Sequence, residues 1–192
     1  MFNDRSTLLS YLATRRSSRP RDLVAPGPDP AQLRQILAIA ARTPDHGKLF
    51  PWRFVHIPAG RRDAFAEMLQ AAYRAGKADP PARLETEAVQ RFATQAPELV
   101  VLLSSPIQGH KIPVWEQELS CGAVAMNLLH AAAALGFGGG WVTGWAAYSP
   151  QVLEALGGRP PERIAGFLFL GTQGAELEER PRPVLEDVVR EW

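Results

Sequence analysis

Two apolar runs constrain the fold more than any other feature of the sequence: LVVLLSS at residues 99–105 and RIAGFLFLGT at residues 163–172. Successive side chains of a strand point to opposite faces of its sheet. A run that is apolar at nearly every position therefore predicts a strand buried on both faces. A sheet built from such strands must be covered by helices.

The rest of the chain supplies these helices. In several segments, apolar residues recur at helical spacing after a capping residue or a proline, and one alternating segment between two prolines predicts a strand. The expected helices cover residues 8–15, 30–43, 62–75, 82–94, 115–135 and 150–157, and the short strand lies between Pro51 and Pro58. Helices and strands do not alternate strictly, which favours an α+β fold. The apolar element in the tail is expected to form an edge strand or an arm.

Composition places the chain among ordinary folded domains. Its 192 residues are 46% hydrophobic and 21% charged, and we expect one domain spanning residues 1–192. Lys and Arg number 21 against 20 for Asp and Glu, so no overall field attracts nucleic acid or an anionic membrane. The most apolar region, residues 121–145, is interrupted by polar residues and glycines, which argues against a membrane span. No signal peptide is recognisable, so we expect a cytoplasmic protein.

Several common chemistries lack their residue patterns. Cys121 is the only cysteine, which excludes an internal disulfide, and its apolar surroundings favour an inert buried thiol. The four histidines lack metal-binding spacing and no acidic calcium loop is present, so we expect no metal. No G-x-S-x-G motif marks a serine hydrolase.

The glycine-rich stretch GFGGGWVTGW, residues 136–145, follows a predicted helix. It contains neither the G-x-G-x-x-G fingerprint of dinucleotide-binding folds nor a P-loop. We expect it to end the helix in a turn. The alternative is that its glycines let the backbone approach a flat ligand, with Trp141 or Trp145 lining the ligand.

The stretch TRRSSRP, residues 14–20, places three arginines and two serines between a predicted helix and a proline-rich segment. Arginines near the last turn of a helix can offset its dipole. The cluster can also bind an anion, because guanidinium groups form paired hydrogen bonds with a phosphate and serine adds a short donor.

These segments together resemble the FMN-dependent nitroreductase family, above all its short members. The likeness runs from about residue 8 to residue 189 and rests on RRSSRP, ARTPDHGKLFPWRFVHI, WEQELSCGAVAMNLLHAAAALGFGGGWVTG, GFLFLGT and RPRPVLEDVV, in the order and spacing of the family. The resemblance implies a mixed central sheet enclosed by helices. It also implies an intertwined homodimer with FMN at the subunit interface.

The resemblance also implies the cofactor-binding residues. Those expected at the FMN phosphate and ribityl chain are Arg15, Arg16, Ser17, Arg19 and Arg182, with Arg180 beside Arg182. Those expected along the flavin ring are Trp141, Val142 and Thr143.

Two further residues, Arg42 and His46, are expected to reach the flavin of the other subunit. Phe50 stands where many relatives have glutamine, so a polar contact near the ring is lost or replaced by stacking. Lys48 stands where larger relatives often have asparagine. Either Lys48 or Arg19 could place a positive charge near flavin N1 and stabilise the reduced, anionic ring.

The function implied is an oxidoreductase in which NADH or NADPH gives a hydride to FMN N5, leaves, and is replaced by a second small-molecule substrate. Nitroaromatics, quinones and similar electron-poor rings are the expected acceptors. No catalytic side chain is expected because the flavin carries the chemistry. The alternatives are an FMN carrier or sensor without a separate substrate, and oxygen-dependent flavin chemistry.

Overall fold

A five-stranded sheet forms the centre of the molecule in the computed structural model, which describes residues 1–192. The strand order is β1-β5-β3-β2, and β4 also pairs with β5. Every pairing within the chain is antiparallel. The strands are β1 (Leu23–Val24), β2 (Trp52–Ile57), β3 (Glu98–Ser104), β4 (Gly138–Val142) and β5 (Arg163–Gln173).

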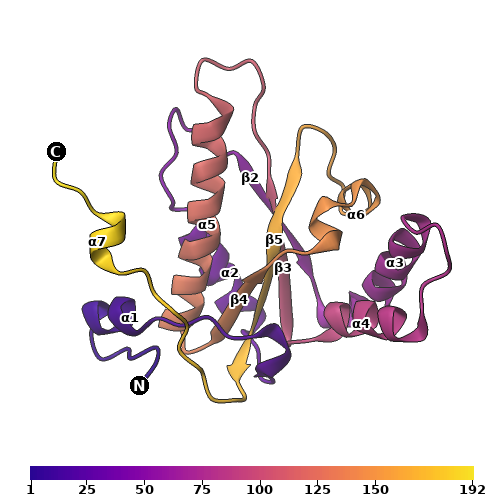
Figure 1. The fold of residues 1–192 in the computed structure, drawn as a ribbon, viewed down its shortest axis with the longest axis horizontal. Helices are drawn as coiled ribbons and strands as arrows, with labels where there is room; N and C mark the ends of the chain where they lie inside the picture. Colours follow the sequence, from indigo (N-terminus) through magenta and orange to yellow (C-terminus); the bar gives the residue numbers. More distant parts are fainter.

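Helices cover both faces of this sheet (Figure 1). One face carries α2 (Pro30–Ala40) and α5 (Val114–Ala134). The other face carries α3 (Arg62–Ala75), α4 (Arg83–Thr94) and α6 (Pro150–Ala155). Short 3-10 helices lie at η1 (Pro20–Asp22), η2 (Ala59–Arg61) and η3 (Trp145–Tyr148).

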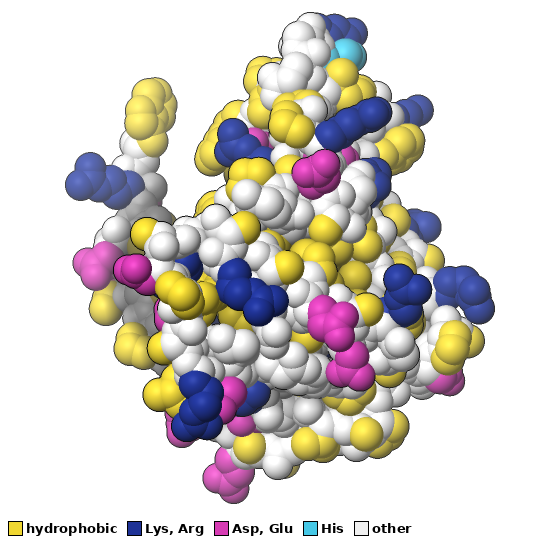
Figure 2. Space-filling model, turned by 90° about the vertical axis from the view of Figure 1, so that its right-hand side faces the viewer, with side chains coloured by type: hydrophobic (Ala, Val, Ile, Leu, Met, Phe, Trp, Pro, Cys, Tyr) yellow, Lys and Arg dark blue, Asp and Glu magenta, His cyan; other side chains and the backbone are white.

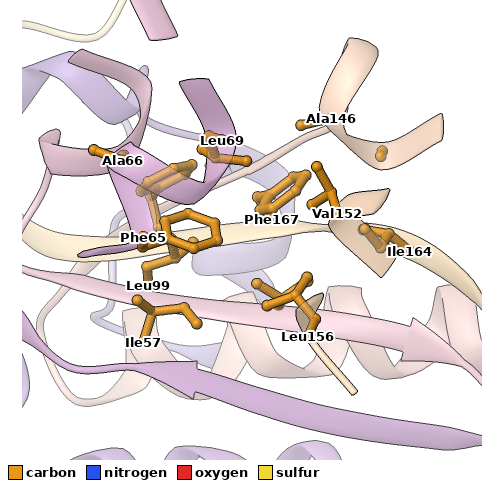
Figure 3. Packing of buried hydrophobic residues seen from close by; sticks show 14 of the residues in the cluster. Ile57, Phe65, Ala66, Leu69, Leu99, Ala146, Val152, Leu156, Ile164 and Phe167 are labelled. Atoms are coloured by element: carbon orange, nitrogen blue, oxygen red, sulfur yellow. The ribbon is translucent and has the colours of Figure 1, made fainter. Parts of the chain in front are cut away.

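Alternate residues of β3 and β5 enter two separate cores. Val101 and Phe167 belong to the core beneath α3, α4 and α6, whereas Val100 and Leu168 belong to the core beneath α2 and α5. Figure 3 shows the first core, where Leu69 of α3 lies above Phe167. The two-sided burial explains why both strands are apolar at nearly every position.

Two short helices lie outside these layers, near the chain termini. They are α1 (Leu8–Thr14) and α7 (Leu185–Val188), and both lie on the same side of the molecule as α5 in Figure 1. Residues 174–192, which we call the C-terminal arm, leave the end of β5 and pass α1. The arm contains one turn of helix and no strand, so of the two expectations for the tail the arm is confirmed.

The α+β class with a helix-covered central sheet is confirmed, but the prediction for the glycine run is wrong. Only Gly136 ends a helix, with a left-handed φ of +95°, and residues 138–142 form β4. The sequence also did not predict β1, whose two residues pair with the end of β5.

None of the helices combines the length and the apolar character that crossing a bilayer requires. Figure 2 shows basic and acidic side chains interspersed over one face, with apolar atoms between them. On that face no single sign of charge dominates.

Candidate functional site

The segment formed by residues 15–19 lies between two helix ends and is neither helix nor strand. Arg15 caps the C-terminus of α1, and Pro20 starts η1. The Asn3 side chain fixes the backbone between them: Asn3 Oδ1 accepts the Arg16 N–H at 2.8 Å, and Asn3 Nδ2 donates to the Arg16 carbonyl at 3.0 Å. The backbone is thereby held while the arginine side chains lie at the surface.

The C-terminal arm brings a further arginine to this segment. Arg182 Nη2 donates to the Arg15 carbonyl at 3.4 Å, across 167 positions of sequence. Arg16 Nε donates to the carbonyl of Glu178 at 2.7 Å, and Arg15 Nη1 lies 3.3 Å from Ser17 Oγ. We call this group the cradle; its members are Arg15, Arg16, Ser17, Arg19 and Arg182.

The donor set of the cradle fits a phosphate group. Four guanidinium groups and one hydroxyl come from two segments that contact each other, and each guanidinium offers a planar fork of N–H donors. The charge of Arg15 also reaches His130 at the end of α5: burial lowers the pKa of His130, and the nearby positive charge of Arg15 lowers it further. The structure thus brings together five residues expected at the FMN phosphate, while Arg180 lies exposed in the same arm.

The glycine strand β4 packs directly against the cradle segment. The Ser18 N–H donates to the Gly139 carbonyl at 2.9 Å, and a Cβ on Gly140 would lie 2.5 Å from the Ser18 carbonyl oxygen. A Cβ on Gly138 would lie 2.7 Å from Ser18 Oγ. These glycines are therefore required by the chain's own packing, which is a different reason from the ligand approach expected from sequence.

Trp141, Val142 and Thr143 continue from these glycines along the free edge of β4. Trp141 Nε1 donates to the Ala165 carbonyl at 3.0 Å, and a Cβ on Gly166 would lie 2.0 Å from the same nitrogen, so the indole packs closely against β5. Val142 is half-buried and Thr143 is exposed just beyond the strand. The three residues expected along the flavin ring thus follow directly on the glycines that contact the cradle segment.

Arg42 and His46 lie in the loop between α2 and β2, residues 41–51, which we call the α2–β2 loop. His46 Nδ1 lies 2.8 Å from Glu116 Oε2 in the first turn of α5, and Arg42 is exposed. The purple loop beside the upper end of α5 in Figure 1 is this segment, at the opposite end of α5 from α1.

The α2–β2 loop has an unusual backbone. Lys48 and Phe50 adopt left-handed φ values of +57° and +51°, which cost free energy in residues other than glycine. Asp45 Oδ2 holds this conformation by accepting the N–H groups of Leu49 at 2.5 Å and Phe50 at 3.0 Å. As a result, the Phe50 side chain is 63% exposed.

The cradle and the α2–β2 loop do not meet within one chain. Tyr11 of α1 contacts His130, with 3.1 Å between the hydroxyl and Nδ1, whereas His46 contacts Glu116. Fourteen residues of α5 separate these two contacts, which is about 21 Å at 1.5 Å per residue. Within one chain, Arg42 and His46 therefore share one loop that lies far from the cradle.

Sequence reasoning missed two residues at the cradle. Ser18 is 5% exposed and its hydroxyl bonds the Gln173 side chain at the end of β5. Glu178 forms an ion pair with Arg19. The run of acids in AELEERPRP, immediately before the basic residues of the tail, was the available signal for Glu178.

Two other features do not form a rival site. Cys121 is 1% exposed, and burial raises the pKa of its thiol to about 11, so the predicted inert thiol agrees with its surroundings.

A surface cavity of about 500 Å³ lies near Arg53 and Glu162, away from the cradle. It contains no residue expected at the cofactor, and its Arg53 and Glu162 pair with each other. No group of three potential metal-binding side chains occurs.

The fold and the cradle define an α+β protein suited to a ligand that carries a phosphate group. The model of the Nitroreductase family matches residues 12–172, and the chain therefore belongs to the nitroreductase family. It is 37% identical over 164 residues to YdjA of Escherichia coli strain K12, a protein named as an NAD(P)H nitroreductase. That match covers 85% of this chain and 87% of YdjA.

Solved structures share the same fold. A nitroreductase-like family protein from Bacillus cereus superposes with a TM-score of 0.81 at 18% identity, covering 100% of this chain and 99% of the other. NfnB from Sphigopyxis sp. strain HMH, named as an FMN and NADPH-dependent nitroreductase, superposes with a TM-score of 0.73 at 22% identity. Its match covers 94% of this chain and 96% of NfnB. At these identities the structural likeness establishes the fold alone.

Proposed function

We propose that residues 1–192 form one FMN-binding domain that oxidises NADH or NADPH and reduces nitroaromatic, quinone or similar electron-poor acceptors. The observation that carries this proposal is the cradle beside β4. Its arginines come from both ends of the chain and meet at the segment formed by residues 15–19. Membership of the nitroreductase family and the name of YdjA support the same reaction class.

In this proposal the chain's own residues bind and orient the cofactor. Arg15, Arg19 and Arg182 hold the phosphate with charge-assisted hydrogen bonds, and Ser17 adds a hydroxyl donor. Trp141 and Thr143 lie along the ring at the free edge of β4. FMN, once bound, supplies the hydride chemistry by accepting a hydride from the nicotinamide and passing electrons to the acceptor. For this reason no acid, base or nucleophile is required among the side chains.

We also propose that the functional unit is a homodimer in which each α2–β2 loop reaches the cofactor held by the other chain's cradle. Large apolar side chains are exposed on α1, on α5 and on the C-terminal arm, which is typical of surfaces that another chain covers. Leu9 is 77% exposed, Trp115 67% and Leu185 66%. The distance between the cradle and the α2–β2 loop within one chain supports the same arrangement. Phe50 would then offer its exposed ring for stacking in place of a polar contact.

The test is a visible spectrum of the protein purified without added flavin, followed anaerobically with NADH and then with NADPH. We expect an oxidised-flavin spectrum that bleaches with one or both nucleotides and returns when a quinone or nitroaromatic compound is added. Bleaching without any acceptor-dependent return would leave an FMN carrier or sensor. A colourless protein that cannot be reconstituted with FMN would refute the proposal. Light scattering at several protein concentrations tests the dimer.

A further inference from the structure

Two carboxylates of the C-terminal arm pair with arginines of the cradle. Glu178 forms an ion pair with Arg19, and Glu179 Oε1 lies 3.0 Å from Arg182 Nη2. The cradle therefore holds anionic groups from its own chain at two of the arginines expected to bind phosphate. Glu179 pairs with Arg182 three residues away along the chain, whereas Glu178 and Arg19 are 159 residues apart.

We propose that Glu178 competes with the FMN phosphate for Arg19. The Glu178 carboxylate weakens FMN binding and leaves Arg19 when FMN binds. This inference rests on the proposed function. A carboxylate and a phosphate both present oxygen acceptors to the guanidinium fork, so they compete for the same N–H donors. A carboxylate that stayed beside a bound phosphate would also repel its negative charge.

The surroundings of Glu178 allow this exchange. The side chains of Arg19 and Glu178 are 52% and 70% exposed, so a carboxylate that leaves Arg19 can be solvated by water. The backbone is held separately, because Arg16 Nε bonds the Glu178 carbonyl and Arg182 bonds the Arg15 carbonyl. The Glu178 side chain can therefore rotate away while the arm keeps Arg182 at the cradle.

The structure also supplies a matched control. Glu176 lies two residues earlier in the same arm, is exposed, and takes part in no ion pair. Glu176→Gln removes the same charge from the same arm without freeing an arginine. Any difference between the two variants therefore reports the Glu178–Arg19 contact and not the net charge of the arm.

The experiment measures dissociation constants for FMN and for riboflavin, by quenching of flavin fluorescence, in the full-length wild type, Glu178→Gln and Glu176→Gln. Riboflavin lacks the phosphate, so it reports the binding of the ring and ribityl chain without the phosphate. We expect Glu178→Gln to bind FMN about threefold more tightly than wild type, because an exposed ion pair contributes little and its loss as a competitor therefore has a small effect. Riboflavin affinity should be the same in all three proteins, and Glu176→Gln should bind FMN as wild type does.

A second comparison tests the role of Arg19. In an Arg19→Ala background, Glu178→Gln should no longer improve FMN affinity, because the contested cation is absent. Weaker FMN binding by Glu178→Gln would overturn the proposal and make Glu178 a residue that orients Arg19. An equal change for FMN and riboflavin, or for both glutamine variants, would also overturn it. Failure of the wild type to bind FMN would refute the proposed function itself.

Discussion

The two ends of α5 carry different halves of the candidate site. At its C-terminal end, the cradle joins residues 15–19, the glycine strand and the C-terminal arm, segments far apart in sequence. At its N-terminal end, the α2–β2 loop is held by local bonds from Asp45, by the contact between His46 and Glu116, and by the Asn127 side chain, which donates to Thr43 Oγ1 at 3.4 Å.

This difference indicates which half of the candidate site one chain can form alone and which half it cannot. The cradle brings its cations together beside the glycines of β4 without help from another molecule. The α2–β2 loop holds Phe50 in a left-handed conformation and leaves its side chain 63% exposed, which is an unfavourable arrangement unless another surface covers that side chain. We infer that the cradle determines cofactor affinity and that the loop acts on a neighbouring chain.

The largest effect is expected from removing two arginines of the cradle. The double variant Arg15→Ala, Arg182→Ala should weaken FMN binding by about 100-fold or more, because each charge-assisted hydrogen bond contributes on the order of 1.5–3 kcal/mol. Riboflavin binding should change little. Arg21→Ala removes an exposed arginine just outside the cradle and serves as the control. Equal losses for FMN and riboflavin would mean that the arginines support the fold and not the phosphate.

A smaller effect is expected from disturbing the contact between β4 and the cradle segment. In Gly140→Ala the new Cβ would lie 2.5 Å from the Ser18 carbonyl oxygen, so the backbone must shift. Overpacking of this kind costs about 1–3 kcal/mol, measurable by denaturant unfolding. Gly60→Ala, whose Cβ meets nothing within 4 Å, should leave stability nearly unchanged. A neutral Gly140→Ala would show that the glycine strand and the cradle are not tightly coupled.

The α2–β2 loop is expected to act between chains. Arg42→Ala, His46→Ala should weaken FMN binding by about tenfold, as expected for loss of a charged contact. Mixed dimers distinguish a site shared between two chains from a site within one chain. In these dimers one chain carries the loop variant and the other carries Arg15→Ala, Arg182→Ala. If each site combines one chain's cradle with the other chain's loop, one site is intact and about half the wild-type FMN is retained. If each site lies within one chain, both sites are damaged and no such recovery occurs.

The sequence predicted the parts of the fold that side-chain patterns encode. Continuous apolar runs indicated β3 and β5, and helical spacing indicated α2, α3 and α5 close to their observed bounds. The strand β4 was missed because Gly138, Gly139 and Gly140 have no side chains to alternate, and its strand conformation comes from pairing with β5. Two-residue β1 likewise exists only because it pairs with the end of β5.

The site was predictable only in part, and for a related reason. The composition of residues 14–20 indicated anion binding, and the resemblance to a family selected that interpretation over a helix-dipole role. The positions of the individual FMN contacts stay predictions. The contacts of Glu178 with Arg19 and of Ser18 with Gln173 were missed because they join residues 159 and 155 positions apart, and only the tertiary fold brings them together.

The smallest effect is expected at the base of the α2–β2 loop, where Arg53 of β2 holds Glu162 just before β5. Arg53 Nε and Nη2 donate to the two carboxylate oxygens at 2.7 and 2.9 Å. These hydrogen bonds, with smaller contributions from Ser105 and from the Arg159 N–H, lower the pKa of Glu162 from 4.5 to about 2. The ion pair fixes the start of β2, and therefore the end of the loop, to the start of β5.

Because the folded-state pKa of Glu162 lies below its unfolded value, the stabilisation is fully present above about pH 4.5 and is lost as the pH falls toward 2. Arg53 is 45% exposed, so solvent screening limits the contribution to about 1 kcal/mol. Glu162→Gln should therefore be less stable than wild type near about pH 6, and the difference should shrink near about pH 3. Denaturant unfolding at both pH values measures it, with Glu176→Gln as a control that has no ion pair. A difference that does not change with pH would show that Glu162 acts through packing and not through its charge. The α2–β2 loop would then have no acid-sensitive ion pair at its base to set it apart from the cradle.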